Sequence, residues 1–531
     1  MNPSPKNQLA LLLIEGFGLS TSSIGNAIWA ANPKAFFDLW RRYPHFALQT
    51  RSAKDKKTSS SHTSESNFST LASGTITETN QEYINRVIKD GSIDKSGHLA
   101  KKLDQNSVHM ASVHLVGSIS KDDSLGCIRH LEAIIDEISN KNVHNVYIHL
   151  IIDETIDTKF DLLDLVEKVE KLAARSANIH IATIGGADFF RETVSAKIDK
   201  LSTGFKSIYR GTNNSALSLS QAISLYLKSN ERPSEMQPVS ILSNGMLSGR
   251  IGDFDLIVFF NHNLVGLERL MFSFVTDTGI NNQTSLSRSI SVLSLISPTH
   301  GNERIISIID RSYETNLFST ISSAGLSQIV ASDSSRMQLL QSYFPSNKSG
   351  IEEMYIPAPL AFNQYLSKYQ RITNKVAEGA FSALSRKSCD FALLHIPCLD
   401  IVAESGSLND AVAAVKYVDR LIDLFVKSAS SMGIRVIISA SIGRAEKMTR
   451  TANQRACVAT SNPVPFIYVP DEQGTTKRTK FHPSHEIITE LLHPKHHIAD
   501  IAPTILNILG LETPSYMTGK ALTESFARDI D

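Results

Sequence analysis

The stretch Gln8–Gly18, QLALLLIEGFG, decides the fold. Six consecutive apolar residues, Leu9 to Ile14, have the length and composition of a strand that is buried on both faces of a parallel sheet. Glu15 follows directly, and Gly16 and Gly18 let the backbone turn sharply after it. We therefore expect the Glu15 carboxylate to stand at the carboxyl edge of the sheet, where open α/β folds keep their ligands.

Length and composition limit the classes of protein that the chain can belong to. Its 531 residues are too many for one core, so we expect two domains. Lys plus Arg and Asp plus Glu both total 53, which gives no electrostatic attraction to nucleic acid or to an anionic membrane. The four cysteines are scattered without a C-x-x-C pair, and no stretch approaches the roughly 20 apolar residues of a membrane span. We expect a soluble cytoplasmic protein with no nucleic-acid or membrane partner.

Strand and helix signals alternate along the chain in two sets, from about residue 110 to 260 and again from about 305. This βαβ repetition predicts largely parallel sheets covered by helices. The clearest predicted helix runs from about Asn409 to Lys427, where apolar residues repeat at helical intervals, namely Val415, Val418, Ile422 and Phe425. The first strand is apolar throughout and needs neighbours on both sides, so we expect it to join the second set. The predicted domains are therefore residues 1–80 with 301–531, and an inserted domain of residues 81–300.

Three local predictions follow from composition. Pro33 interrupts the helical spacing of Ile24 to Trp40 and is predicted to start a second helix. The Ser-rich, aperiodic stretch Arg51 to Thr70 is predicted to be a solvated loop. Asn281 to Ser297 is also Ser-rich and is predicted to be a connector.

Several longer segments resemble one family in the same order along the chain. LLLIEGFG is followed by GNAIWAANPKAFFDLW, and the second half adds SNPVPFIYV (Ser461 to Val469) and ADIAPTILNILGLETPSYMTGKAL (Ala499 to Leu522). The middle of the chain adds IHLIID (Ile148 to Asp153) and IVFFN (Ile257 to Asn261). Together they resemble the cofactor-independent, or 2,3-bisphosphoglycerate-independent, phosphoglycerate mutase family of the alkaline phosphatase superfamily. The resemblance implies an α/β fold, in which an alkaline-phosphatase-like three-layer α/β/α domain is interrupted after its nucleophile loop by a second α/β domain that binds substrate.

The resemblance also implies a reaction. In the family, two manganese ions activate a serine, which accepts the phosphate of 3-phosphoglycerate and returns it to the 2-hydroxyl. Divalent ions lower the pKa of a bound hydroxyl and neutralise charge on phosphoryl oxygens, so their ligands must be carboxylates, imidazoles or the alkoxide itself. Each ligand position can therefore be checked by residue type.

The nucleophile loop retains its central pair. The family's GNSEVGH falls on HTSESNF, so Ser64 occupies the nucleophile position beside Glu65, while the glycines and the following histidine are lost. The opening Asp of the family's DGWG corresponds to Glu15, which can still ligate but is one methylene longer.

The C-terminal metal positions are mostly replaced. Asp400 is kept, but the histidine that accompanies it in the family is Glu404 here. The family's ADHGN aligns with ASIGR, which puts Ser441 and Ile442 at two further ligand positions, and the last histidine falls on Ala459. Isoleucine and alanine have no donor atom for a metal. From the remnant positions Glu15, Asp400 and Glu404 we expect no metal cofactor, or at most one weakly held divalent cation such as Mg²⁺ or Ca²⁺ in place of two Mn²⁺.

Positions that bind substrate in the family are replaced as well. Asp153 remains from the family's DGRD, but its arginine is Thr155. The catalytic lysine falls near Ser335, and the neighbouring Arg336 is a candidate displaced cation. The other lost histidine and arginine positions hold Leu125, Ala187, Thr193, Asn263 and Gly266. Asp153 and Arg336 are therefore the candidate substrate-binding residues.

Five histidines near the C-terminus, in the segments HPSHE and HPKHH, look like a metal cluster. They lie in proline-containing loops and match none of the family's ligands, so we expect exposed loop histidines instead. They are His482, His485, His493, His496 and His497.

Three functions follow from these residues. The first is a pseudoenzyme, in which the mutase fold serves as an interaction or regulatory module for an unknown protein partner. The second is a working mutase that converts 3-phosphoglycerate to 2-phosphoglycerate, or a phosphatase, with a site rebuilt from recruits such as Glu404 and Glu446. The third is a sensor that binds a phosphorylated metabolite without turning it over. Loss of most members of a cooperating catalytic set favours the first.

Overall fold

The structure is a computed structural model. It describes residues 8–50, 64–91, 93–120, 126–153, 156, 159–191, 198–229, 231–264, 266–276, 289–298, 304–309, 315–341, 343–344, 350–359, 362–448, 459–471 and 494–526.

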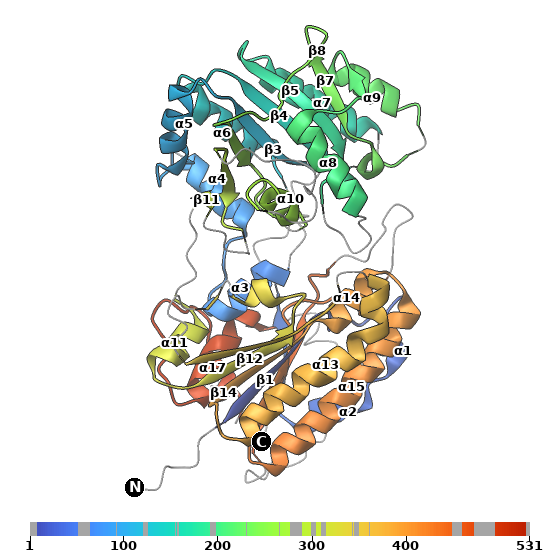
Figure 1. The fold of residues 1–531 in the computed structure, drawn as a ribbon. Coiled ribbons are helices and arrows are strands. Elements are labelled where there is room, and N and C mark those ends of the chain that lie inside the picture. The colour runs from blue at the N-terminus through green and yellow to red at the C-terminus, as the bar shows by residue number, and fades with distance from the viewer. Residues whose placement is uncertain are drawn as a thin grey trace. The chain divides into compact units, whose positions relative to one another are not determined.

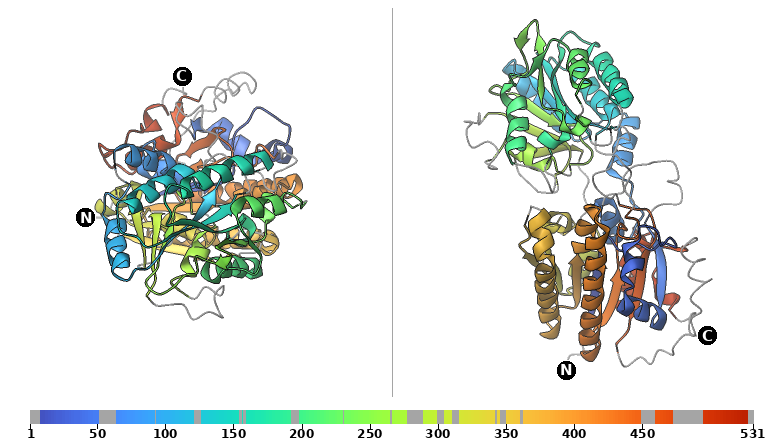
Figure 2. Two further views of the ribbon diagram at one scale, coloured as in Figure 1. Left: turned by 90° about the horizontal axis from the view of Figure 1, so that it is seen from above. Right: turned by 90° about the vertical axis from the view of Figure 1, so that its right-hand side faces the viewer.

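The chain forms two compact units, each with its own sheet and its own hydrophobic core. Unit 1 consists of Met1–Thr77 and Tyr313–Asp531, and unit 2 consists of Glu78–Ser312. The sequence placed the boundaries near residues 80 and 300. Figure 2 shows the layers of each unit from two directions.

The sheet of unit 1 is built around its first strand, as the sequence predicts. Its eight described strands follow the order β13-β12-β14-β1-β15-β16-β2-β17. β1 lies between β14 and β15, is parallel to both, and is buried along its whole length. β16 is antiparallel to its neighbours β15 and β2. The strands are β1 (Leu9–Ile14), β2 (His45–Gln49), β12 (Gln328–Asp333), β13 (Ile351–Ile356), β14 (Phe391–Ile396), β15 (Arg435–Ser439), β16 (Val464–Val469) and β17 (His496–His497).

Helices cover both faces of this sheet (Figure 1). On one face α1, α2, α13 and α14 pack around the long α15, and on the other face α3, α11 and α17 contact one another. The apolar face expected of α15 is buried, because Val415, Val418, Ile422 and Phe425 all belong to the core. The helices are α1 (Ala27–Ala31), α2 (Lys34–Arg42), α3 (Ser64–Ser73), α11 (Leu317–Ser323), α12 (Met337–Gln341), α13 (Phe362–Ser385), α14 (Cys398–Glu404), α15 (Leu408–Ser431) and α17 (Ile501–Ile508).

Unit 2 contains the second sheet, in which the central strands are parallel. Its order is β11-β10-β9-β3-β4-β5-β7-β6, and β8 pairs with β7. The strands are β3 (Val113–Ile119), β4 (Val146–Ile152), β5 (Ile179–Gly186), β6 (Ser215–Ala216), β7 (Val239–Ser243), β8 (Met246–Leu247), β9 (Leu256–Phe259), β10 (Ser291–Ile296) and β11 (Ile305–Ile309). The helices are α4 (Asn80–Lys89), α5 (His98–Val108), α6 (Ile128–Ser139), α7 (Lys159–Ala173), α8 (Ile198–Arg210), α9 (Leu219–Tyr226) and α10 (Glu268–Phe272).

Two of the local predictions are wrong in part. The predicted loop ending at Thr70 runs into α3, which begins at Ser64 and buries Phe68 and Leu71. The predicted connector contains β10, a buried strand. In both segments serine and threonine dilute the apolar residues, so no period is visible in the sequence. Pro33 does precede a second helix, but as the cap of α2 and not as its first residue.

In the described ranges, none of the helices combines the length and the hydropathy that crossing a bilayer requires.

Candidate functional site

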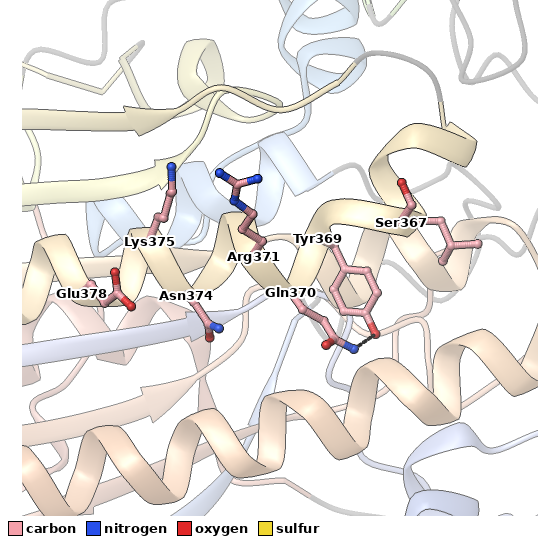
Figure 3. A pocket seen from close by; sticks show the side chains of 8 residues that line it. Ser367, Tyr369, Gln370, Arg371, Asn374, Lys375 and Glu378 are labelled. Carbon is pink, nitrogen blue, oxygen red and sulfur yellow. Dashed lines mark hydrogen bonds between the residues drawn. The ribbon is translucent and has the colours of Figure 1, made fainter.

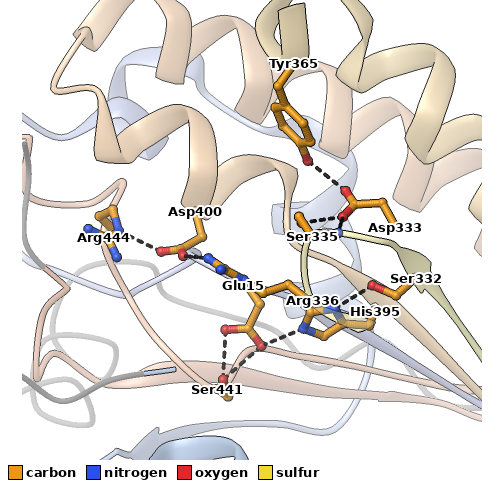
Figure 4. A network of polar contacts seen from close by, with 10 residues as sticks. All are labelled: Glu15, Ser332, Asp333, Ser335, Arg336, Tyr365, His395, Asp400, Ser441 and Arg444. Carbon is orange, nitrogen blue, oxygen red and sulfur yellow. Dashed lines mark hydrogen bonds and ion pairs between the residues drawn. The ribbon is translucent and has the colours of Figure 1, made fainter. Parts of the chain in front are cut away.

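The carboxyl ends of β1, β12, β14 and β15 bring polar side chains of unit 1 together (Figure 4). Glu15 directly follows β1, and Asp400 lies in α14, just after β14. Ser441 follows β15 after one residue, and Asp333 is the last residue of β12. Parallel strands end at the same edge, which explains how residues far apart in sequence meet.

Glu15 is buried, and its carboxylate is held by neighbouring strands. The Ser441 hydroxyl lies 2.8 Å from both carboxylate oxygens of Glu15 and donates to them. Nε2 of His395, in β14, lies 3.4 Å from Glu15 Oε1. Nδ1 of the same ring lies 3.0 Å from the Ser332 hydroxyl oxygen. Both polar ends of His395 are thus turned toward side chains of adjacent strands.

Gly16 makes this arrangement possible. Its φ is +87°, a left-handed value, and a Cβ atom at this position would lie 2.8 Å from the backbone N and Cα of Asp400. Only glycine allows the chain to turn here while α14 approaches so closely. The turn after β1 therefore places Glu15 and Asp400 at the same edge.

Asp400 lies between two guanidinium groups. Arg336 donates from a terminal nitrogen to Oδ2 at 3.0 Å, and Arg444 donates from Nε to Oδ1 at 2.6 Å. The Asp400 side chain has no exposed surface, whereas those of Arg336 and Arg444 are 26% and 12% exposed. Burial raises the pKa of the Asp400 carboxyl, but Arg444 and Arg336 outweigh burial and lower it overall. We call Arg336, Asp400 and Arg444 the guanidinium clamp.

Asp333 is also satisfied by neighbouring groups. It accepts a hydrogen bond of 2.8 Å from the Tyr365 hydroxyl, and further bonds from the backbone N–H and the hydroxyl of Ser335. Ser335 is the residue that the sequence resemblance puts near the family's catalytic lysine, which stays a prediction. The neighbouring Arg336 is the cation that the sequence suggested, but the structure places it on Asp400.

Glu446, a suggested recruit, lies in a pocket of small residues. Its Oε1 accepts hydrogen bonds from Thr460 and Asn462, while its Oε2 is buried without a partner among the described residues. A Cβ atom at Gly18 would overlap its carboxyl group. Burial raises the pKa of the Glu446 carboxyl, which favours its protonated form. The other suggested recruit, Glu404, is half-buried at the end of α14.

The remaining predicted positions in unit 1 are only partly described. Ser64 is the first residue of α3, but its side chain lies outside the described atoms, as does that of Glu65. Ile442 is fully buried, and Ala459 is half-buried. Neither offers a ligand atom, as the sequence indicated.

In unit 2, Asp153 directly follows β4 and is fully buried. Its Oδ2 lies 3.4 Å from a terminal nitrogen of Arg191, also buried. Arg191 was not among the predicted site residues. Thr155, Leu125 and Thr193 lie outside the described residues, so a substrate site around Asp153 stays a prediction.

The described histidines of the predicted loop cluster are His496 and His497, and both are half-buried in β17. His496 Nδ1 lies 3.9 Å from Asp500, and His497 Nδ1 accepts from the backbone N–H of Ala499 at 3.1 Å. The other three histidines are not described. Within the described ranges, no three His, Cys, Asp or Glu side chains converge as a metal site would require.

A surface hollow of about 620 Å³ lies along α13 (Figure 3). Arg371 and Lys375 point to one side of the helix, and Gln370 and Asn374 point to the other. Its lining includes none of the residues of the carboxyl edge, so we assign it no part in the site.

Several site residues were missed by the sequence analysis, namely His395, Arg444, Ser332 and Asp333. A usable signal existed for three of them, because Ser332, Asp333 and His395 lie at the last or next-to-last position of a parallel strand. The rule that ligands gather at carboxyl ends of strands would have pointed to them.

Comparison with known proteins finds several that are similar to this chain. The family model described as BPG-independent PGAM N-terminus matches residues 84–292. A 2,3-bisphosphoglycerate-independent phosphoglycerate mutase of Methanococcoides burtonii is 26% identical over 98% of this chain and 99% of its own. One from Clostridium tetani is 25% identical with the same coverage.

A crystal structure of Leishmania mexicana phosphoglycerate mutase, at low cobalt concentration, matches with a TM-score of 0.73. It covers 98% of both chains at 16% identity, so it bears on the fold alone. The predicted fold class, an alkaline-phosphatase-like α/β/α domain with a second α/β domain, is confirmed.

The expectation of no metal cofactor, or at most one weakly held divalent cation, is wrong in light of these comparisons. The matching structure is that of a phosphoglycerate mutase at low cobalt concentration. The relatives that match the full length carry the name 2,3-bisphosphoglycerate-independent phosphoglycerate mutase.

The family model covers much of unit 2, full-length relatives cover both units, and the fold agrees throughout. Over almost its whole length the chain is therefore similar to 2,3-bisphosphoglycerate-independent phosphoglycerate mutases.

Proposed function

We propose that this chain is a 2,3-bisphosphoglycerate-independent phosphoglycerate mutase homologue that does not interconvert 3-phosphoglycerate and 2-phosphoglycerate, and that it acts as an interaction or regulatory protein. The guanidinium clamp is the observation that carries this proposal. Asp400 is the acidic residue that the chain keeps at a family metal position, and each of its carboxylate oxygens accepts a hydrogen bond from an arginine.

The guanidinium clamp buries a carboxylate and pairs it with two arginines. A buried carboxylate must be paired and hydrogen-bonded, and breaking such a pair is strongly destabilising. The 2.6 Å contact from Arg444 is short, as hydrogen bonds between charged groups tend to be. Burial lowers the pKa of the Arg336 guanidinium, but Asp400, followed by Glu404, Glu15 and Asp333, raises it overall. The positive charges next to Asp400 are therefore those of two arginine side chains of this chain.

The neighbouring groups agree with this reading. Ser441 uses its hydroxyl to donate to Glu15, and Ile442 and Ala459 supply no donor atoms. Within the described residues no three His, Cys, Asp or Glu side chains converge, so a two-metal centre would need ligands from outside them. No reaction step can be derived through such a centre from these residues.

The second candidate is an active mutase with a rebuilt site. The relatives favour it, because similarity over 98% of this chain leads to proteins named as phosphoglycerate mutases. In that case the substrate would be 3-phosphoglycerate, and ligands would have to come from residues beyond those described. Cobalt or manganese therefore belongs in every test of activity.

A coupled assay for 2-phosphoglycerate formation, with Mn²⁺ or Co²⁺ added, separates the two candidates. The Methanococcoides burtonii relative serves as the positive control. We expect a rate at least about 10³-fold below that of the relative, because most members of the catalytic set are replaced. Any residual rate should be the same in Ser64→Ala. A rate of about 1 to 10³ per second that disappears in Ser64→Ala would establish the active mutase instead.

Calorimetric titration with 3-phosphoglycerate tests the sensor. Binding without turnover would replace the interaction role by that of a metabolite sensor. We expect no saturable binding, because few of the family's phosphate-binding arginines remain at matching positions.

A further inference from the structure

A continuous chain of four buried side chains crosses the sheet of unit 2. Asp255 Oδ2 lies 3.1 Å from His114 Nε2, and His114 Nδ1 lies 3.0 Å from His149 Nε2. His149 Nδ1 lies 2.9 Å from the Thr183 hydroxyl oxygen. Asp255 directly precedes β9, and the other three lie in β3, β4 and β5, so the chain joins four strands that are neighbours in the sheet. We call these four residues the histidine relay.

The direction of every hydrogen bond in the histidine relay is fixed when both rings are neutral. An ionised Asp255 can only accept, so His114 must carry its proton on Nε2. The other nitrogen of His114 is then bare and must accept from His149 Nε2. His149 Nδ1 is bare in turn and accepts from the Thr183 hydroxyl. All donors therefore point toward Asp255.

The surroundings keep Asp255 ionised. Its Oδ1 accepts from the backbone N–H of Ser112 at 2.7 Å, and its Oδ2 accepts from that of Gly252 at 2.6 Å. Burial raises the pKa of the Asp255 carboxyl, but the hydrogen bond from His114 and these backbone bonds lower it overall. The carboxylate is thus a fixed acceptor at one end of the histidine relay.

Further titratable rings lie beside the histidine relay in the described residues. The ring of Tyr147 stacks on His114 with centroids 5.3 Å apart, and the ring of His180 lies 5.6 Å from Tyr147 on the side of β5. Burial and the charge of Asp255 raise the pKa of the Tyr147 hydroxyl, so it stays neutral. In the contacts described for them, the two ring nitrogens of His149 face His114 and Thr183, neither of which is a carboxylate.

The histidine relay can take up one proton and no more while the strands stay paired. A proton added to His149 Nδ1 can be donated to Thr183, provided that the hydroxyl turns its own hydrogen elsewhere. A second proton would have to sit on His114 Nδ1, where it would face the N–H of His149 across 3.0 Å. Two imidazolium rings cannot share that contact.

We propose that the histidine relay is an acid latch, which ties four strands of unit 2 together at neutral pH and opens when the unit is acidified. Burial, followed by the neighbouring His114, lowers the pKa of His149 well below its ordinary value of 6.5. Histidines in an unfolded chain bind protons near pH 6.5, so the unfolded unit binds protons that the folded unit does not bind. Stability present above about pH 6.5 is therefore lost as the pH falls below it.

Nitrogen NMR of the full-length chain labelled with ¹⁵N-histidine tests the direction of the histidine relay without any substitution. At pH 7 His149 should be neutral, with its proton on Nε2, the nitrogen that faces His114. Between pH 7 and 5.5, no more than one of the two rings should become protonated while unit 2 remains folded. A proton on Nδ1 of either ring at pH 7, or two protonated rings in the folded unit, would overturn the latch.

Hydrogen exchange across β3, β4 and β5 in the full-length chain tests the consequence for stability. Each proton withheld from the folded state raises the unfolding equilibrium constant by about tenfold per pH unit below 6.5. His149→Gln should reduce the pH dependence of the unfolding equilibrium constant by one such factor of about ten per pH unit. His144→Gln, at an exposed position, is the control and should not reduce it. Equal pH dependence in His149→Gln and the unmodified chain would contradict the proposal. If His149→Gln does not fold, the NMR titration decides alone.

Discussion

At the scale of single residues, Asp400 depends on its two arginines because its carboxylate has no exposed surface. Arg444→Met keeps the length and apolar stem of the side chain but removes one guanidinium. Because a buried charge then loses a partner, we expect the free energy of unfolding of unit 1 to fall by about 3 to 5 kcal/mol. Urea unfolding of the full-length chain, followed by a probe in unit 1, measures the loss.

Arg420→Met is the matched control for that prediction. Arg420 lies exposed on α15 and bonds only to a backbone carbonyl of its own helix among the contacts described. Its loss should change the free energy of unfolding by less than about 1 kcal/mol. Equal effects of the two substitutions would show that the guanidinium clamp contributes no more than an ordinary surface contact.

Glu446 should make unit 1 less stable at alkaline than at mildly acidic pH. Burial raises the pKa of this carboxyl, so the folded chain keeps the proton above the ordinary value of 4.5. The stability that this provides is present below pH 4.5 and is lost as the pH rises through the raised pKa. Glu446→Gln is neutral at every pH and should remove that dependence, by about 1.4 kcal/mol per unit of pKa shift. Melting temperatures at pH 5 and pH 8 test this, and parallel changes in both proteins would refute it.

Residue identity predicted what the site lacks better than what it contains. Ile442 and Ala459 have no donor atoms in any conformation, so the sequence alone excludes them as ligands. The pairing of Arg336 and Arg444 with Asp400 spans 64 and 44 residues of sequence and depends on where long, flexible side chains end. No local sequence pattern predicts such a contact.

At the scale of elements, the turn after β1 should tolerate no side chain at Gly16. A left-handed φ costs a residue with a side chain about 1 to 2 kcal/mol, and here a Cβ atom would also press on the backbone of α14. Gly433 has φ of +70° with nothing within 4 Å of an added Cβ, so Gly433→Ala measures the cost of φ alone. We expect Gly16→Ala to lower the free energy of unfolding more than Gly433→Ala does. Equal losses would mean that α14 moves away freely.

Elements could be predicted where apolar residues set a clear period, and not elsewhere. β1 and α15 were predicted because their buried positions form an unbroken run in one and a helical stripe in the other. α3 was missed because its buried face includes polar side chains such as Asn67 and Ser69 beside Phe68. Burial in α3 is decided by its packing on α11 and α17, which the local sequence does not encode.

At the scale of the whole molecule, the two units should respond differently to acid. Each has its own core, so thermal unfolding should show separate transitions. Unit 2 contains His130, whose pKa is lowered to about 3 by burial, by His262 and by Arg129. The unfolded chain binds a proton on His130 that the folded unit does not bind. The free energy of unfolding of unit 2 therefore falls as the pH falls from about 6.5 toward 3.

Between pH 7 and pH 5, the stability of unit 1 should respond to pH in the opposite direction. Its Asp400 carboxyl, with a lowered pKa, begins to destabilise the fold only as the pH falls toward the ordinary value of 3.8. Glu446 favours the folded state more as the pH falls. Calorimetry at pH 7 and pH 5 should therefore show the unit 2 transition, identified by hydrogen exchange in β3 and β4, losing about 2 kcal/mol from His130 alone. His130→Gln should recover that part of the loss, and a unit 1 transition that falls by as much would contradict this division of charges.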